Sequence, residues 1–73
     1  MTDLERAILD VESRFWRHAG AKEDHVRQNL GLTPGTYYQR LNALLDRPEA
    51  IAHAPLVVNR LRAVRARGRR RAA

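Results

Sequence analysis

The sequence predicts an all-α protein built from four or five short helices. Apolar residues recur at spacings of three and four between turn signals, which is the spacing of one helix face. Glycine or proline separates these stretches at Gly20, Gly31, Pro48 and Pro55. With 73 residues and no cysteine, the chain has a small core and no disulfide to hold it together.

The first predicted helix begins at Asp3, where Thr2 and Glu5 form a capping box, and continues until Gly20. The apolar stripe that we expect to face the core consists of Leu4, Ile8, Val11 and Phe15. The opposite, solvated face carries Asp10, Glu12, Arg14 and Arg17. Beside the stripe, either sealing the core or facing a second subunit, lie Leu9 and Trp16.

A second, shorter helix is predicted over residues 21–29, with Val26 as its central apolar residue. Gly31 follows where a left-handed residue lets the chain leave a helix. Thr33 and Pro34 then suit the N-cap and the first position of another helix. The second and third helices are therefore joined by a short turn.

The third predicted helix, residues 34–46, has two faces of different character. Its apolar face consists of Tyr37, Leu41, Leu44 and Leu45. Its outward face is small, polar and basic, and consists of Gly35, Thr36, Gln39, Arg40 and Ala43. We expect this helix to pack on one side and to bind a partner with the other.

Proline divides the remainder of the chain into a short helical turn over residues 48–52 and a longer helix over residues 55–68. The two adjacent rows of the longer helix are Leu56, Arg60 and Val64, and Val57 and Leu61. We expect the inner row to dock on the bundle, with four arginines projecting outward, namely Arg60, Arg62, Arg65 and Arg67. Composition predicts that Gly68 ends the helix and that residues 69–73 are disordered. The predicted domains are residues 1–54 and a basic helix and tail over residues 55–73.

Charge is distributed unevenly along the chain. The net charge is +6, and arginine supplies thirteen of the fourteen basic residues. Residues 1–26 carry four basic and six acidic side chains, whereas residues 27–73 carry ten and two, so the two parts have charges of −2 and +8. Such a basic pole attracts polyanions, and nucleic acid is the commonest one inside cells. Acidic protein surfaces and anionic lipid headgroups are the other partners that fit this charge.

The segment Leu30-Gly31-Leu32-Thr33-Pro34-Gly35-Thr36 resembles a known DNA-binding motif. Together with Val26, Tyr37 and Leu41, it supplies the turn glycine and apolar anchors of a helix-turn-helix. The motif is similar to that of sigma factor region four and of LuxR-type response regulators, over about residues 4–46. The resemblance implies that the third helix enters the DNA major groove. The whole chain also resembles a family of short actinobacterial proteins of unknown function.

Two positions depart from the resembling motif. Relatives usually have a small residue where this chain has Arg27, so either the arginine stem extends along the interface to solvent or the helices cross at a greater distance. Relatives prefer valine or isoleucine where this chain has Tyr37. The core must therefore accommodate the ring, and the hydroxyl must bond a partner or water.

The resemblance implies DNA contacts by residues of the third helix and its cap, namely Thr33, Gly35, Thr36, Tyr38, Gln39, Arg40 and Asn42. We expect Gln39 to pair with adenine and Arg40 with guanine. The alternatives are that Arg40 contacts only phosphate, that Gln39 is merely solvated, and that Tyr38 completes the edge of the core. The C-terminal arginines either contact the DNA backbone and minor groove or solubilise the chain, and comprise Arg60, Arg62, Arg65, Arg67, Arg69, Arg70 and Arg71.

We therefore expect a cytoplasmic, nucleoid-located protein that binds duplex DNA and regulates transcription. One such unit contacts few base pairs, so useful specificity predicts a homodimer or a larger partner. Two alternatives are a module that docks on RNA polymerase or another transcription protein, and a nucleoid protein that coats DNA without sequence preference.

Other classes of function find no support in the sequence. The acidic residues Glu5, Asp10, Glu12 and Glu49 lack an accompanying nucleophile, so we expect no enzymatic activity and no cofactor. The three histidines show no metal-ligand spacing, so we expect no metal site. No apolar run approaches the roughly 20 residues of a membrane span, and without cysteine nothing indicates an oxidising compartment.

Overall fold

Helices make up most of the chain in the computed structural model, which describes the backbone of residues 1–72 and the side chains of residues 1–68. In chain order they are α1 (Asp3–Ser13), α2 (Ala19–Leu30), α3 (Pro34–Leu44), α4 (Pro48–His53) and α5 (Pro55–Ala72). Since the described residues include no strand, the all-α prediction is confirmed.

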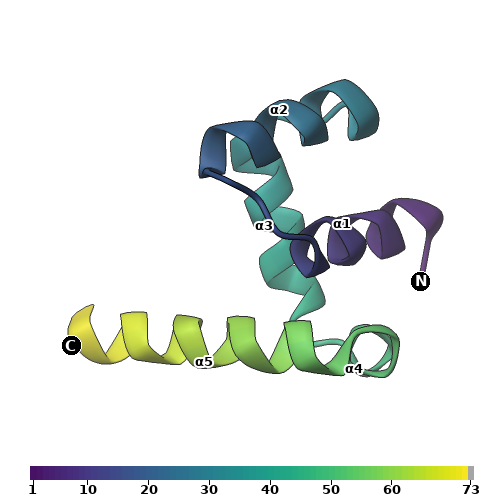
Figure 1. The fold of residues 1–73 in the computed structure, drawn as a ribbon. Coiled ribbons are helices and arrows are strands. Elements are labelled where there is room, and N and C mark those ends of the chain that lie inside the picture. Colours follow the sequence, from purple (N-terminus) through teal and green to yellow (C-terminus); the bar gives the residue numbers. More distant parts are fainter. Residues whose placement is uncertain (73) are drawn as a thin grey trace.

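The first three helices contact one another pairwise, and α4 and α5 pack against α1 and against each other. Figure 1 shows α3 extending from α2 at one end toward α5 at the other, while α5 continues past the bundle to the C-terminus. The core collects apolar side chains from all five helices, and consists of Ile8, Leu9, Val11, Val26, Tyr37, Leu41, Leu44, Leu45, Ala50 and Val58. Because Leu9 is fully buried, it cannot face a second subunit.

The turn between α2 and α3 has the predicted conformation. Gly31 is left-handed, with φ of 69°, and its amide donates to the Arg27 carbonyl at 3.2 Å. Thr33 caps α3 and Pro34 occupies its first turn. The Arg27 side chain is 61% exposed and forms an ion pair with Asp24 at 2.5 Å. Its stem therefore points to solvent and does not separate the two helices.

The first helix is shorter than predicted. It ends at Ser13, and Arg14 beyond it is extended, so the expected apolar stripe is broken and Phe15 is 94% exposed. Trp16 turns back instead, and its indole donates to the Val11 carbonyl at 2.7 Å. The same carbonyl also accepts from the Arg14 amide at 3.3 Å, so both bonds secure the C-terminus of α1. Of the two roles expected for Trp16, the structure supports packing against the core.

The last helix differs from the prediction at both ends. It passes through Gly68, which lacks the positive φ of a helix stop, and continues to Ala72, so the prediction that Gly68 ends it was wrong. At the start of α5 the fully buried residue is Val58, whereas Leu56 is 84% exposed and Val64 is 51% exposed. The docking face thus includes Val58 and Leu61, and it is rotated away from the predicted row of Leu56, Arg60 and Val64.

Neither a membrane-spanning helix nor a metal-binding cluster is found in the described part of the chain. Within residues 1–72, no helix is long and apolar enough to cross a membrane. Among the described side chains, no three of the types His, Cys, Asp and Glu gather where they could hold a metal ion. The described histidines have other contacts: the His18 side chain caps α2, and His53 Nε2 lies 3.1 Å from Asp10 Oδ1.

We expect Gly31→Ala and Gly35→Ala to change stability in opposite directions. Alanine at position 31 must adopt the left-handed conformation, which lowers the free energy of unfolding by about 1–2 kcal/mol. Gly35 lies in a helix with open space around its α-carbon, so Gly35→Ala is expected to raise it by about 0.5 kcal/mol. Urea unfolding followed by circular dichroism measures both. Stabilisation by Gly31→Ala would show that this turn is not held as described.

Candidate nucleic-acid interface

The third helix presents one polar face to solvent and buries the other. Tyr37, Leu41 and Leu44 are buried on the inner face. The exposed side chains are Thr36, Tyr38, Gln39, Arg40, Asn42 and Ala43, together with Gly35. The division between the two faces matches the predicted one. The exposed face is therefore held in a fixed orientation by the packing behind it.

The first turn of α3 is capped and open. Thr33 Oγ1 accepts a hydrogen bond from the Thr36 amide at 3.3 Å and donates one to Thr36 Oγ1 at 3.0 Å. Between them, Gly35 has no atom within 4 Å of the place where a Cβ would lie. Another molecule's backbone can therefore approach this turn closely.

Tyr38 lies at the edge between α2 and α3. Its hydroxyl donates to Glu23 Oε2 at 3.4 Å, and the Lys22 ammonium lies 5.1 Å from the ring centroid. The ring also meets the Tyr37 ring edge-on, with centroids 5.1 Å apart. These contacts favour the interpretation in which Tyr38 completes the edge of the core.

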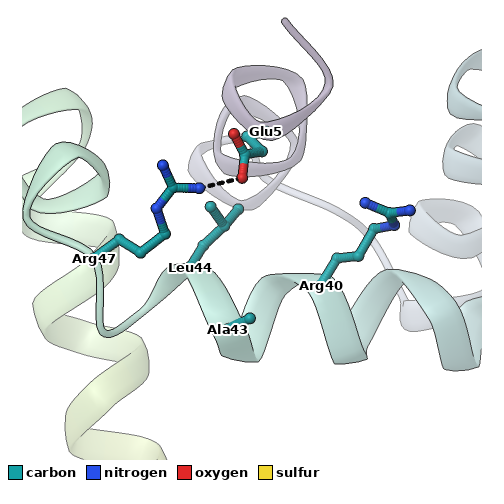
Figure 2. Close-up of a pocket in the computed structure, with 5 residues that line it drawn as sticks. All are labelled: Glu5, Arg40, Ala43, Leu44 and Arg47. Carbon is teal, nitrogen blue, oxygen red and sulfur yellow. Dashed lines mark hydrogen bonds and ion pairs between the residues drawn. The ribbon is translucent and has the colours of Figure 1, made fainter. Parts of the chain in front are cut away.

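The second half of the exposed face borders a small pocket beside α1. The pocket encloses about 120 Å³ and is lined by Glu5, Arg40, Ala43, Leu44 and Arg47. Figure 2 shows Arg47 joined to Glu5 across the pocket, whereas the guanidinium of Arg40 reaches out without a bond to the other residues drawn. No hydrogen bond or ion pair engages Arg40 anywhere among the described residues.

The other arginine of the pocket is neutralised. Arg47 forms ion pairs with Glu5 and, at 3.1 Å, with Glu49. The pKa of the Glu5 carboxyl is lowered, first by the hydrogen bond from the Thr2 amide and also by the charge of Arg47. Arg47 therefore ties α1 to the end of α3, and Arg40 is the basic group of this face that remains available.

The arginines of α5 do not all project outward as predicted. Arg62 and Arg67 are exposed and have no partner among the described side chains. Arg60 instead donates to the Glu12 carbonyl at 3.0 Å. The Arg65 side chain is only 20% exposed, because it forms an ion pair with Asp46 at 2.7 Å. The expected outward projection of Arg65 was therefore wrong, whereas Arg60 is exposed but bonds back to α1.

The remaining predicted DNA contacts are those of Asn42 and of the last three arginines. Asn42 was expected at the DNA groove, but its side-chain oxygen accepts a hydrogen bond from Arg65 at 3.0 Å. The side chains of Arg69, Arg70 and Arg71 lie outside the described part of the structure.

A buried polar cluster fixes α3 to α1 and α2. Glu12 of α1 is 8% exposed, and its Oε2 atom accepts a hydrogen bond from the Tyr37 hydroxyl and one from the Lys22 ammonium, the latter at 3.0 Å. The prediction that Glu12 is solvated was wrong. The signal was its spacing: Glu12 follows the fully buried Ile8 by four residues, which places both on one helix face. The cluster supplies the partner that the Tyr37 hydroxyl needs.

Burial and the Glu12 carboxylate together set the protonation of the cluster. Burial raises the pKa of the Tyr37 hydroxyl far above its usual range, and the hydrogen bond to Glu12 raises it further. Burial lowers the pKa of Lys22, but the hydrogen bond and charge of Glu12, together with smaller effects of Tyr38, more than offset this, so the pKa of Lys22 is raised. Both donors therefore stay protonated at neutral pH.

We expect Glu12→Ala to lower the free energy of unfolding by about 3 kcal/mol, because the Tyr37 hydroxyl and the Lys22 ammonium lose their shared acceptor. The control is Asp24→Ala, which removes an exposed ion pair with Arg27 and should cost less than about 1 kcal/mol. Urea unfolding measures both variants. Equal losses would contradict a structural role for the cluster.

The cluster also predicts loss of stability in alkali. The pKa of Tyr37 in the folded protein lies above its unfolded value of about 10, so its stabilising contribution is complete below pH 10 and is lost as the pH rises further. Above pH 10 this group should lower the free energy of unfolding by up to about 1.4 kcal/mol per pH unit. The free energy of unfolding of Tyr37→Phe should therefore fall less steeply than that of the wild type between about pH 8 and pH 11, as measured by urea denaturation. Identical slopes for the variant and the wild type would mean that Tyr37 ionises as easily in the folded protein as in the unfolded one.

Comparison with known proteins gives a family and no activity. Neither the curated proteins nor the solved structures include one that matches this chain. A family model does match, and it covers residues 1–73. The match agrees with the resemblance to short proteins of unknown function. The chain therefore belongs to the family described as "Protein of unknown function (DUF3263)".

Proposed function

We propose that this chain binds duplex DNA through α3, with α2, the turn and α3 acting as a helix-turn-helix in a transcriptional regulator. The observation that carries the proposal is the exposed face of α3, which is small and polar and includes Arg40, a cation without a partner among the described residues. The buried face behind it is anchored by Tyr37. A recognition helix needs both properties, because it must enter the major groove without changing its orientation.

The exposed side chains have the chemistry of base recognition. Glutamine can form two hydrogen bonds with adenine, and arginine can form two with guanine, each pair giving about 1–3 kcal/mol of discrimination. Gln39 and Arg40 occupy the middle of the exposed face. Because Arg40 has no intramolecular ion pair, binding a base breaks no such bond.

Phosphate contacts would come from two elements. The first turn of α3 offers the positive end of a helix dipole beside the small residues Thr33, Gly35 and Thr36. In α5, Arg62 and Arg67 are exposed and unpaired among the described residues, and Arg69 to Arg71 follow in sequence. These charges supply the sequence-independent part of the affinity.

The arginine content of α5 also favours a second candidate, a protein that coats DNA without sequence preference. Of the twelve residues from Arg60 to Arg71, seven are arginine and none is acidic. In this case the affinity depends on salt and on α5, and only weakly on Gln39 and Arg40. The two candidates differ in whether α3 discriminates between sequences.

Arg40→Ala tests the proposal. We expect about tenfold or greater loss of affinity for a duplex selected from a random library, together with relaxed preference at one guanine, because a bidentate contact is lost. Arg27→Ala is the matched control, since it removes the same charge from an exposed position on α2. It should weaken selected and scrambled duplexes equally, by about twofold at most. Fluorescence anisotropy at several salt concentrations measures all four affinities.

Other results of these binding measurements would assign a different role to Arg40 or to the chain. Equal weakening on all duplexes by Arg40→Ala would assign Arg40 to phosphate. A wild-type chain without sequence preference but with a steep salt dependence would favour the coating role. Failure to bind any duplex at about 10⁻⁴ M would contradict both forms of the proposal.

A further inference from the structure

Among the described residues, Arg65 makes the hydrogen bonds that join a side chain of α5 to α3 and to the turn that follows it. Its guanidinium donates to both carboxylate oxygens of Asp46, at 2.7 and 3.3 Å, and to the side-chain oxygen of Asn42 at 3.0 Å. We call these three residues the clamp. The fork of the guanidinium matches the carboxylate, so the contact fixes direction as well as distance.

The clamp distinguishes Arg65 from its neighbours. Arg62 and Arg67 are exposed, whereas the side chain of Arg65 is 20% exposed. The hydrogen bond that Arg65 donates to Asp46 raises the pKa of Arg65. A guanidinium held in this way has few donors left for phosphate, so Arg65 is a poor candidate for a direct contact with DNA.

The clamp lies between the part of α5 that packs on the bundle and the part that extends past it. Before it, α5 is held by the buried Val58 and by the bond from Arg60 to the Glu12 carbonyl. After it come residues 66–72, which we call the arginine arm. The arm extends about 10 Å at 1.5 Å per residue, and Figure 1 shows this end of α5 running past the bundle. Arg65 is thus the last described side chain that bonds α5 to another helix.

We infer that Arg65 is a positioning residue, which fixes the angle between α5 and α3 so that the arginine arm meets the DNA backbone on one flank of the site bound by α3. The inference rests on the proposed function. The longest extent of the molecule is 35 Å, which equals about one turn of B-form DNA and sets the length of duplex that the molecule can span. The expected ligand is therefore a duplex of at least about ten base pairs.

Asp46→Asn separates positioning from charge. The substitution removes a negative charge and no arginine, so electrostatics alone predicts tighter binding. Loss of the clamp predicts the opposite, about five- to tenfold weaker binding of the selected duplex, because the arm is no longer held in place. Hydroxyl-radical footprinting on the same duplex should show protection lost on one flank and retained at the centre.

Three further variants complete the test. Arg65→Gln should weaken binding and shorten the footprint as Asp46→Asn does, and the losses should not add in the double variant, because both substitutions break the bond between Arg65 and Asp46. Asp24→Asn makes the same charge change away from the clamp, and should leave the footprint unchanged. Circular dichroism checks that each variant keeps its helix content, which we expect because Asp46 is 63% exposed and ion pairs at the surface contribute little to stability.

Asp46→Asn that binds as tightly as the wild type, with an unchanged footprint, would overturn the inference and leave the proposed function intact. Additive losses in the double variant would also overturn it, because they would assign Arg65 to DNA and not to Asp46. A wild-type chain that binds no duplex would overturn the proposed function, and the inference with it.

Discussion

The buried carboxylate of Glu12 is the contact on which the arrangement of the helices depends. Glu12 belongs to α1, its Oε2 atom accepts from Lys22 of α2 and Tyr37 of α3, and its carbonyl accepts from Arg60 of α5. One residue therefore joins four of the five helices. In a chain with so small a core, a satisfied polar cluster adds what apolar packing lacks, because its hydrogen bonds specify distances and directions and not merely burial.

The cluster has a direct consequence for the candidate interface. The inner face of α3 is anchored by Tyr37, so the helix cannot rotate about its own axis without breaking a buried bond. Its outer face, with Gly35, Gln39 and Arg40, is consequently presented in one orientation. Binding to a groove is favoured by this rigidity, because little conformational freedom is lost when the partner arrives.

The basic residues divide into two groups with different tasks. Arg47 and Arg65 are engaged by carboxylates, so they hold helices together and contribute little free charge. Arg40, Arg62 and Arg67 have no partner among the described side chains and are available to a polyanion. The net charge of +6 therefore does not show which arginines can bind a partner, since some arginines of the basic half hold helices together.

Local signals determined the elements that the sequence predicted correctly. Gly31 and Thr33 set the turn before α3, because a left-handed glycine and a capping hydroxyl act within a few residues. Helical spacing likewise determined which face of α3 is buried. Only the tertiary structure decided which side chains bond Glu12, that Val58 and not Leu56 docks, and that Arg65 binds α3. These features depend on contacts between segments far apart in the chain, and periodicity within one helix cannot specify which neighbour each side chain meets.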